Sequence, residues 1–395
     1  MTSTTSVTQP MPAYDVVVIG AGIAGTSIAA HLAEHCSVCL IEMERQPGYH
    51  STGRSAAVFA AFYGNETVRS LTRASRVFFT APPRSFTSVD LLKPRAALIT
   101  ARAGQTEALE HFIAAAKTTD HIELRSAAEA LALCPILRPE ELAAAAQLTG
   151  LADIDVNELH QYFLRMFKAH GGSIKVEAQV HALERDARGW VIKTATEAVR
   201  GSIVVNAAGA WAGEVAKLAG AQDIELQPLR RSACLIDPPA GTRVESWPMV
   251  VNAAEELYFK PDAGLLLLSP GDETLTEPSD AQPDEMDIAI AVDRLERTTT
   301  LQVKRIVQRW AGLRSFVADR SPVVGFDHQQ PDFFWMAALG GYGIQTAPAL
   351  GRVASSLLMR ESLADDLLAC GIDVAKLAPD RLNRARPCQY GVGLA

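Results

Sequence analysis

Strand-like and helix-like patterns of hydrophobic residues alternate at both ends of this chain. Residues 14–20 read YDVVVIG, a run of β-branched residues closed by glycine, which predicts a buried parallel strand. A helix predicted over residues 24–35 and a strand predicted over residues 37–42 complete a β-α-β unit. A strand, a turn of small residues and a helix are predicted again at 202–220 and at 333–359. These segments predict an α/β fold.

The intervening segments carry other patterns. Residues 96–146 are rich in alanine and helical in pattern, and residues 153–172 predict a helix that begins with the capping box DVNE. Residues 173–199 predict strands joined at the turn RDARG, and residues 227–269 predict short strands separated by turns such as KPDAG. We therefore expect a second, α+β domain inserted between the α/β segments.

The composition is that of an ordinary globular protein. The 395 residues are 48% hydrophobic and 21% charged, with a net charge of −8, which allows two domains with a large core. No basic patch stands out, so a nucleic-acid partner is not expected. The uncharged run over residues 16–30 is too short and too rich in glycine to span a bilayer, so stable membrane insertion is not expected. Residues 1–13 lack an apolar signal core and predict a disordered tail on a cytoplasmic protein.

The cysteines and histidines show no metal-ligand spacing. Cys36 and Cys39 are spaced as C-x-x-C, but Cys39 lies inside the apolar run VCLIE. We therefore interpret the cysteines as buried thiols of a reducing compartment and expect no metal site.

Three glycines between the first strand and the first helix form the pattern G-x-G-x-x-G. Gly20 suits a tight turn, Gly22 lets the backbone approach a pyrophosphate, and Gly25 lets helix and strand pack closely. Glu42 ends the next strand, where a carboxylate accepts hydrogen bonds from ribose hydroxyls. This combination predicts a dinucleotide site, and the motif alone allows NAD or FAD. The later small-residue turns NAAGAW and GGYGIQT favour the larger FAD, because its tricyclic ring needs contacts from distant segments.

Short motifs spread in order over residues 16–346 are VIGAGIAG, QPGYHSTGRSAA, DIDVNELHQ, VVNAAGAW, LQPLRRSA, YFKPDAG, WAGLRSFVAD and GGYGIQT. Together they resemble the D-amino acid oxidase/dehydrogenase family of flavoproteins, and bacterial FAD-dependent D-arginine dehydrogenases especially. The resemblance implies noncovalent FAD in a Rossmann-like FAD-binding domain of α/β class, with an inserted α+β substrate-binding domain. We place the FAD-binding domain at 14–93, 153–224 and 316–395, and the substrate-binding domain at 94–152 and 225–315.

The resemblance implies that residues 51–57 of the stretch GYHSTGRSAAVFAAFYG lie along the flavin cofactor, and that its apolar end, residues 58–63, lines the substrate cavity or its lid. Its hydroxyl-bearing residues Ser51, Thr52 and Ser55 are expected along the polar part of the cofactor. Arg54 either faces a phosphate, fixes the loop or forms a surface salt bridge. The expected cofactor-binding residues are Gly20, Gly22, Ala24, Gly25, Glu42, Met43, Ser51, Thr52, Gly53, Arg54, Ser55, Ala56, Ala57, Val180, Gly340, Tyr342, Gly343, Ile344 and Gln345.

The resemblance also implies a site for an α-carboxylate. A guanidinium binds a carboxylate through two parallel hydrogen bonds, and Arg231 and Arg314 match the family's carboxylate-binding arginines. Tyr258 matches a tyrosine that donates a hydroxyl, and Gly341 matches a backbone contact to the substrate. Without the resemblance, Arg231 would be interpreted as a solvated residue and Tyr258 as a cross-strand aromatic residue.

Two departures from the D-arginine dehydrogenases concern the substrate side chain. Val58 stands where those enzymes have a histidine, and Ala97 stands where they have a glutamate. Tyr63 is kept, and Glu255 lies near an acidic position of the family. Loss of a counter-charge disfavours a cationic substrate. We therefore expect a neutral side chain against an apolar wall that includes Val58, although a buried helix end is the other interpretation of this segment.

These features predict FAD-dependent oxidative deamination of D-amino acids, with hydride transfer from the α-carbon to flavin N5. The imino acid would hydrolyse to a 2-oxo acid and ammonia. Oxidation of a secondary amine, an imino acid or a 2-hydroxy acid is the alternative on the same fold. A dinucleotide-binding regulator without turnover is a third hypothesis, which a carboxylate clamp disfavours. The amino acid substrate would reduce the flavin, and the reduced flavin would pass the electrons to an acceptor that the sequence does not identify.

Overall fold

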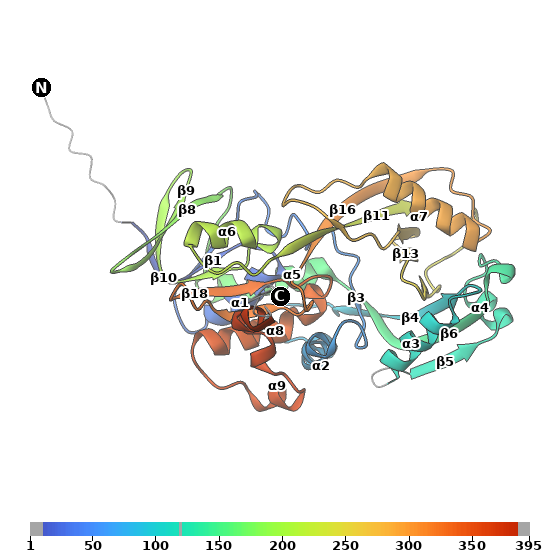
Figure 1. Cartoon of the computed structure of the whole chain (residues 1–395), viewed down its shortest axis with the longest axis horizontal. Coiled ribbons are helices and arrows are strands. Elements are labelled where there is room, and N and C mark those ends of the chain that lie inside the picture. The colour runs from blue at the N-terminus through green and yellow to red at the C-terminus, as the bar shows by residue number, and fades with distance from the viewer. Residues whose placement is uncertain (1–10, 118–120, 386–395) are drawn as a thin grey trace, which may run out of the picture.

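Two β-sheets organise the chain, and they lie in the two halves of Figure 1. The computed structural model describes residues 11–117 and 121–385. The first sheet has the strand order β17-β18-β10-β1-β2-β7, and the hairpin β8–β9 extends it through β10. Its strands are β1 (Ala13–Ile19), β2 (Val38–Ile41), β7 (Ser173–Lys175), β8 (Val180–Asp186), β9 (Gly189–Thr194), β10 (Ala198–Asn206), β17 (Val323–Phe326) and β18 (Phe333–Ala337). Strands β1, β2, β7, β10 and β18 run parallel, which confirms the α/β class.

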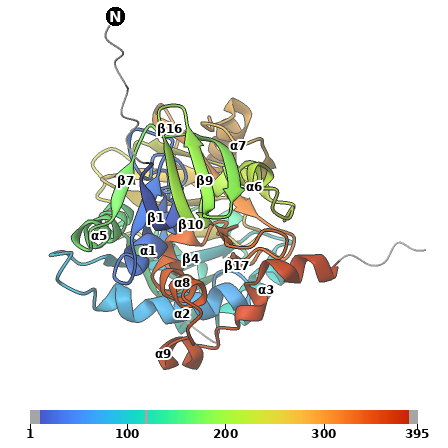
Figure 2. The same ribbon diagram turned by 90° about the vertical axis from the view of Figure 1, so that its left-hand side faces the viewer.

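Helices cover both faces of the first sheet. Val16 and Val18 of β1 pack in one core with residues of α1 (Ile23–Leu32), α5 (Val156–Ala169) and α8 (Gly343–Leu358). Val17 and Ile19 point to the other face and share a core with α6 (Ala212–Ala219). Figure 2 shows α6 on the opposite side of β10 from α1 and α5. Burial on both faces explains why the strand pattern is continuous and not alternating.

The second sheet forms the other half of the molecule. Its strand order is β15-β11-β14-β13-β12-β4-β6-β3, with β16 paired to β11 and β5 paired to β6. Its strands are β3 (Val58–Phe59), β4 (Leu92–Ala101), β5 (His121–Arg125), β6 (Ala144–Ile154), β11 (Gln227–Ile236), β12 (Met249–Asn252), β13 (Tyr258–Asp262), β14 (Leu265–Ser269), β15 (Thr274–Leu275) and β16 (Ile306–Phe316). The helices of this half are α3 (Thr106–Ala116), α4 (Ala127–Leu133) and α7 (Glu285–Thr298).

The helical interpretation of residues 96–146 is wrong for much of its length. Strands β4 and β5 and the start of β6 lie in this segment, and α3 and α4 are the α-helices among its described residues, 96–117 and 121–146. Strand β4 pairs with β6 from Leu92 to Ala101 and with β12 over four residues. The small side chains of Ala97 and Ala101 are buried in the core that this sheet shares with α3. Pairing with distant strands therefore outweighs the helix propensity of alanine.

Other local predictions are confirmed, and the capping box is half right. The turn RDARG joins β8 to β9, and KPDAG joins β13 to β14. The Asp155 carboxylate caps α5 by accepting the N–H of Glu158. The Glu158 carboxylate does not return to the backbone of Asp155, because it accepts hydrogen bonds from Thr87 and Arg165. In place of a reciprocal cap, the Glu158 carboxylate connects α5 to the loop that carries Thr87.

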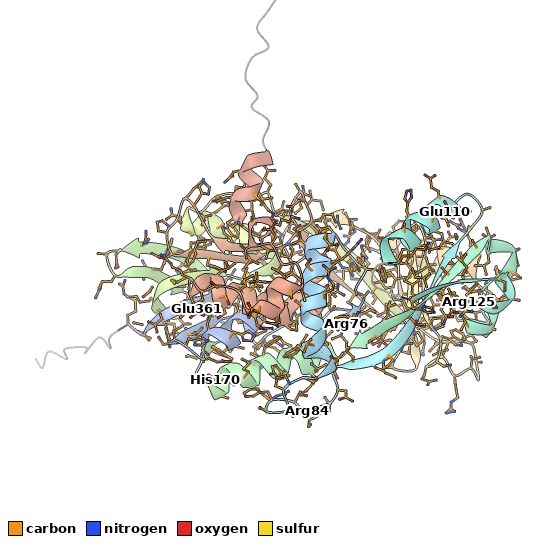
Figure 3. All side chains as sticks on the ribbon, turned by 90° about the horizontal axis from the view of Figure 1, so that it is seen from below. Arg76, Arg84, Glu110, Arg125, His170 and Glu361 are labelled. Atoms are coloured by element: carbon orange, nitrogen blue, oxygen red, sulfur yellow. The ribbon has the colours of Figure 1, made fainter. Side chains whose placement is uncertain are left out.

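The two sheets follow the chain segments that were assigned to two domains. All strands of the first sheet lie in the FAD-binding segments, and β3 and the ends of β4, β6 and β16 are the parts of the second sheet that also do so. Helix α2 (Glu66–Thr80) crosses between the halves in Figure 3, where labelled charged residues such as Arg84 and Glu110 lie on the outside. The domain boundaries stay a prediction.

Residues 1–10 of the predicted tail over residues 1–13 lie outside the described residues. The prediction is wrong for Ala13, which pairs with Arg200 in the first sheet.

Candidate active site

One long pocket begins at the carboxyl ends of the parallel strands and continues along the second sheet. Its first part is lined by the ends of β1, β2, β10 and β18 and by the starts of α1 and α8. Its second part is lined by residues of β11, β13 and β16. Ligands of open α/β sheets bind outside the carboxyl ends of the strands. The pocket therefore joins the dinucleotide edge of the first sheet to a second compartment on the other sheet.

The glycine turn is shaped by close backbone approaches. Gly20 has a φ of 101°, and a Cβ there would lie 2.5 Å from the carbonyl oxygen of Ala207. A Cβ at Gly25 would lie 1.8 Å from the carbonyl oxygen of Gly20, so only glycine lets α1 pack this close to β1. Gly22 is the N-cap of α1, has no side-chain cap and lines the pocket. The N-terminal end of α1 thus faces the pocket. The Thr52 hydroxyl accepts the N–H of Ile23, and the following N–H groups and the helix dipole stay open to an anion.

Glu42 lies at the end of β2 with its carboxylate held in place. Oε2 accepts the N–H of Ala21 at 2.8 Å, and Oε1 accepts the N–H of Glu44 at 2.9 Å. The residue is buried and lines the pocket. This position matches the carboxylate that binds ribose hydroxyls in dinucleotide-binding folds.

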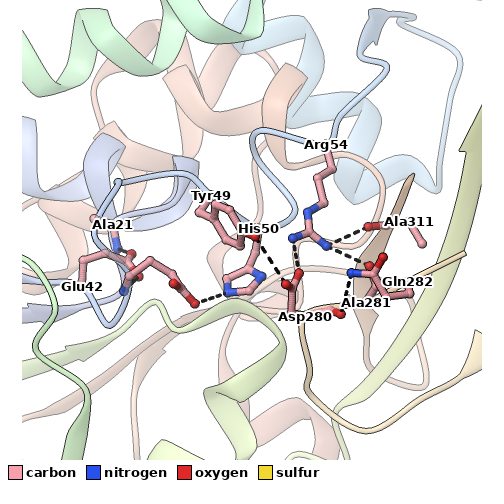
Figure 4. Close-up of polar contacts among 10 residues, drawn as sticks. Ala21, Glu42, Tyr49, His50, Arg54, Asp280, Ala281, Gln282 and Ala311 are labelled. Atoms are coloured by element: carbon pink, nitrogen blue, oxygen red, sulfur yellow. Dashed lines mark hydrogen bonds and ion pairs between the residues drawn. The ribbon is translucent and has the colours of Figure 1, made fainter. Parts of the chain in front are cut away.

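The loop over residues 48–56 is fastened to both sheets. The Thr52 hydroxyl accepts the N–H of Ile23 at 3.0 Å, and the Ser51 hydroxyl donates to the carbonyl of Leu313 at 2.6 Å. The Arg54 guanidinium donates to the carbonyls of Ala281 and Ala311, and it pairs with Asp280 (Figure 4). Arg54 therefore fixes the loop and also forms an ion pair with the exposed Asp280, and a contact with a phosphate stays a prediction.

The substrate end of the pocket is lined by Arg231, Tyr258, Arg314 and Gly341. Among the described residues, the Arg314 guanidinium makes no hydrogen bond and no ion pair. A Cβ at Gly341 would lie 3.0 Å from Nη1 of Arg314, so glycine leaves room beside this group. Burial opposes the charge, yet the pKa of Arg314 is raised because Tyr63, Tyr258, Glu273 and Tyr342 surround it. A permanent positive charge thus stands unpaired beside the pocket.

Arg231 is already engaged on one side. Its Nε donates to the carbonyl of Asp272 at 2.7 Å, and its Nη2 lies 3.3 Å from Oε1 of Glu273. These contacts could not be predicted from the sequence, since Glu273 lies 42 positions further along the chain. The two arginines that were predicted to bind the carboxylate together therefore differ. The guanidinium of Arg314 has no partner among the described residues, whereas that of Arg231 is bonded to Asp272 and Glu273.

A family model for FAD-dependent oxidoreductases, named DAO, matches residues 15–357. The chain belongs to the DAO family of FAD-dependent oxidoreductases. The resemblance to the wider family is thereby confirmed, whereas the closer one to D-arginine dehydrogenases is not shown.

Relatives and solved structures agree with this membership. A glycine oxidase from Geobacillus kaustophilus (strain HTA426) is 23% identical over 371 residues, which is 90% of this chain and 95% of that protein. The crystal structure of a glycine oxidase from Geobacillus kaustophilus superposes with a TM-score of 0.80 at 20% identity, covering 94% of this chain and 99% of that one. The crystal structure of L-proline dehydrogenase from P. horikoshii superposes with a TM-score of 0.77 at 22% identity, covering 95% and 99%. These structures show that the fold is that of the family.

Most residues predicted to bind the cofactor line the pocket of this DAO-family chain. They are Gly20, Gly22, Ala24, Glu42, Met43, Ser51, Thr52, Arg54, Ser55, Ala56, Val180, Gly340, Gly343 and Ile344. Gly25, Gly53, Ala57, Tyr342 and Gln345 do not line it. Gln345 instead accepts the N–H of Ala60 and donates to the hydroxyl of Thr72, and Tyr342 packs against Tyr63 and Phe316. Gln345 and Tyr342 thus make their contacts outside the pocket. The cofactor-binding roles of the residues that line the pocket stay predictions.

The predictions omitted one wall of the pocket. This wall includes Tyr49 and His50, and Trp211 in the turn after β10. The His50 ring stacks at a tilt on Trp211, with 4.6 Å between their centroids, and its Nε2 lies 2.9 Å from the Glu44 carboxylate. The motif NAAGAW was the available signal, because it follows a parallel strand whose carboxyl end meets those of β1 and β2.

The expected apolar wall lies beside the pocket and not in it. Val58, Ala97 and Tyr63 belong to one apolar core with Ala60, and none of the three lines the pocket. Ala97 is 1% exposed, so its small size fills a packed core and does not open a cavity. Ala97 therefore takes no part in a wall of the site, although it stands where the D-arginine dehydrogenases have a glutamate. Glu255 is exposed and does not line the pocket either.

The pocket residues fit FAD. The open end of α1, the glycine approaches at β1 and the buried carboxylate of Glu42 suit the pyrophosphate and ribose of a dinucleotide. The compartment along β11, β13 and β16 gives a flavin ring room beyond them. Gly20, Gly22 and Glu42 would hold the nucleotide half, and the segments 51–56 and 340–344 would contact the flavin half.

Two expectations made from composition concern the rest of the molecule. Cys36 and Cys39 are free thiols, and burial raises the pKa of each to about 11, so neither is poised as a reactive thiolate. Cys388 lies outside the described residues. Across the residues that the structure describes, no helix is both long enough and apolar enough to cross a bilayer. The cytoplasmic location stays a prediction.

Proposed function

We propose that this chain oxidises the amine-bearing carbon of amino acids, and that D-amino acids with neutral side chains are its substrates. The observation that carries the proposal is the Arg314 guanidinium, which faces Gly341 in a pocket that fits FAD. An unpaired guanidinium at the wall of a pocket suits a carboxylate. The hydroxyl of Tyr258, from β13 of the same sheet, would add a second donor.

The protein's part in this reaction is to hold the substrate and to keep its amine neutral. Arg314 and Tyr258 would bind the carboxylate and so orient the α-carbon. The positive charge of Arg314 disfavours an ammonium group nearby, which favours the neutral amine, whose lone pair assists hydride loss from the α-carbon. When bound, FAD supplies the acceptor of that hydride. The amino acid becomes an imino acid, which water converts to a 2-oxo acid and ammonia.

The preference for a neutral side chain rests on two positions that differ from the D-arginine dehydrogenases that the chain resembles. Val58 and Ala97 stand where those enzymes have a histidine and a glutamate, and neither residue lines the pocket. Without that glutamate, a cationic side chain would lose its hydration without gaining a partner. The preference for the D-isomer rests on the resemblance to D-amino acid dehydrogenases.

The relatives support amine oxidation and keep one alternative open. Glycine oxidase, by its name, acts on a primary amine, and L-proline dehydrogenase acts on a secondary amine. Oxidation of a secondary amine is therefore the second candidate for this chain. The same arginine would bind the carboxylate in either reaction.

Anaerobic reduction of the bound flavin tests the proposal. The purified yellow protein is mixed with D-leucine, D-methionine, D-phenylalanine and D-arginine, with their L-isomers, with proline and with 2-hydroxy acids. We expect the neutral D-amino acids to bleach the flavin fastest. Bleaching by proline alone would select the secondary-amine alternative, and bleaching by none of the amino acids would reject amino acid oxidation. Oxygen uptake by the reduced protein then shows whether oxygen is the electron acceptor.

A further inference from the structure

Glu273 connects two arginines behind the substrate end of the pocket. Its Oε1 lies 2.8 Å from Nη2 of Arg320 and 3.3 Å from Nη2 of Arg231, and its Oε2 lies 3.1 Å from Nη1 of Arg320. Glu273 comes directly before β15, which pairs with β11, the strand that carries Arg231. One carboxylate thus binds a guanidinium that lines the pocket and one that does not.

Arg320 is a fixed anchor for this carboxylate. Its guanidinium carbon lies 3.8 Å from the ring centroid of Phe316, in cation–π contact. Burial opposes the charge of Arg320, yet its pKa is raised because Glu273 and the Tyr342 hydroxyl bond to it. Its φ of 55° lies in the left-handed region, which residues other than glycine rarely adopt. Contacts on several sides therefore hold Arg320, and through it Glu273, in one place.

Glu273 offsets part of the positive charge at this end of the pocket. Three guanidinium groups gather there, those of Arg231, Arg314 and Arg320. The other acid, Asp272, accepts the N–H and the hydroxyl of Ser232, and burial raises the pKa of its carboxyl. Without Glu273, both Arg231 and Arg314 would present free positive charge to the pocket.

We propose that Glu273 is a positioning residue that restricts the substrate to a single carboxylate. The ion pair with Glu273 offsets the charge of Arg231. Of these two arginines, Arg314 alone then offers an unpaired positive charge to a substrate. A substrate with a second carboxylate finds no free guanidinium and meets the negative charge of Glu273. Removal of that charge turns Arg231 into a second carboxylate site. This inference rests on the proposed function, in which Arg314 binds the substrate carboxylate.

Matched pairs of ligands test this role in the FAD-loaded protein. D-Glutamate and D-glutamine have nearly the same shape and differ by one charge, as do the inert ligands succinate and succinamate. In Glu273→Gln, kcat/KM for D-glutamate relative to D-glutamine should rise by about tenfold or more, mainly through KM, the size of one charge-assisted hydrogen bond. Isothermal titration calorimetry should show the same gain for succinate over succinamate. Glu273→Asp should give a smaller rise, and it carries the same test should the glutamine variant fail to fold.

Glu277→Gln is the matched control. Glu277 lies in the same exposed segment, and its carboxylate has no partner among the residues that the structure describes. This change also removes one negative charge, so an equal rise in the control would point to general electrostatics and overturn the proposal. An unchanged D-glutamate to D-glutamine ratio in Glu273→Gln, or an equal loss for both ligands, would do the same. The calorimetry does not need turnover, so it tests Glu273 even where no amino acid reduces the flavin and the proposed function fails.

Discussion

Arg314 is the residue on which substrate binding is expected to depend most. Its surroundings are aromatic hydroxyls and glycine, and the nearby Glu273 pairs with other arginines. Arg231 differs because the carbonyl of Asp272 and the carboxylate of Glu273 occupy part of its donor set. Two arginines on neighbouring strands thus differ in the number of N–H donors that they can offer to a ligand.

Replacement of Arg314 by alanine should reduce kcat/KM for the best amino acid by tenfold or more, because a charge-assisted hydrogen bond contributes about 1.5–3 kcal/mol. Arg314→Lys should also be poor, since an ammonium lacks the planar fork. Both variants should keep their flavin. Arg309→Ala is the control, because Arg309 lies on the same strand and does not line the pocket, and its one ion-pair partner within residues 11–117 and 121–385 is the exposed Glu285. Near-normal kcat/KM in Arg314→Ala would place the carboxylate site elsewhere.

Gly22 should be essential for flavin binding for a steric reason. A Cβ there would already lie 3.3 Å from the Thr52 hydroxyl, and the larger side chain of Gly22→Val would enter the pocket where the pyrophosphate is expected. We expect a folded, colourless protein, measured by the absorbance of bound flavin and by circular dichroism. Gly213→Ala is the control, since nothing lies within 4 Å of a Cβ at that position. Full flavin occupancy in Gly22→Val would disprove this placement of the pyrophosphate.

At the scale of elements, α1, which follows the glycine turn, packs against α5 and α8 in one core. His31 of α1 contacts the ring of Phe163 in α5, with 6.3 Å between the ring centroids. A Cβ at Gly351 of α8 would lie 3.1 Å from the His31 ring. A titratable ring thus lies at the junction of three helices.

The position of His31 at this junction predicts that the free energy of unfolding falls at acidic pH. Burial lowers the pKa of His31 to about 4, and the positive charge of Arg352 adds to this. The unfolded chain takes up a proton near pH 6.5 and the folded chain only near pH 4, so stability falls as the pH drops through this window, by on the order of 2–3 kcal/mol. The melting temperature of His31→Gln should therefore depend less on pH between 6.5 and 4 than that of the wild type. His181→Gln, an exposed control, should keep the wild-type slope, and a parallel loss of slope in both would contradict the assignment.

At the scale of the whole molecule, the pocket is the place where the two sheets meet. The loop over residues 48–56 bonds to Ile23 beside the first sheet and to Leu313 and Ala311 in the second. A cofactor in this pocket would contact both halves, and it would bind the folded chain but not the unfolded one.

FAD should therefore raise the melting temperature of the apoprotein. At a free concentration of about 100 times the dissociation constant, the gain in stability is about 2.7 kcal/mol. Differential scanning fluorimetry of the apoprotein with increasing FAD measures it. Gly22→Val should show no such shift, and an equal shift in that variant would mean that FAD stabilises the chain from another site.

Much of the first sheet could be predicted because its signals are local. The run VVVIG before Gly22 and Gly25, and Glu42 at the end of the next strand, carry the dinucleotide site within one β-α-β unit. Backbone sterics and the burial of both sheet faces act on neighbouring residues, so they leave a pattern in the sequence. The family motifs then extended this prediction to the positions of Arg231, Tyr258 and Arg314.

Contacts between distant residues were decided only by the tertiary structure. The strands among residues 92–154 exist because β4 pairs with β6 and β12, which outweighs the local preference of alanine. Ala97 fills a core and opens no cavity, and Arg54 fastens a loop to residues more than 200 positions away. Glu273 binds Arg231 because β15 pairs with β11. Each of these outcomes depends on which strands become neighbours, and no local pattern of residues encodes that choice.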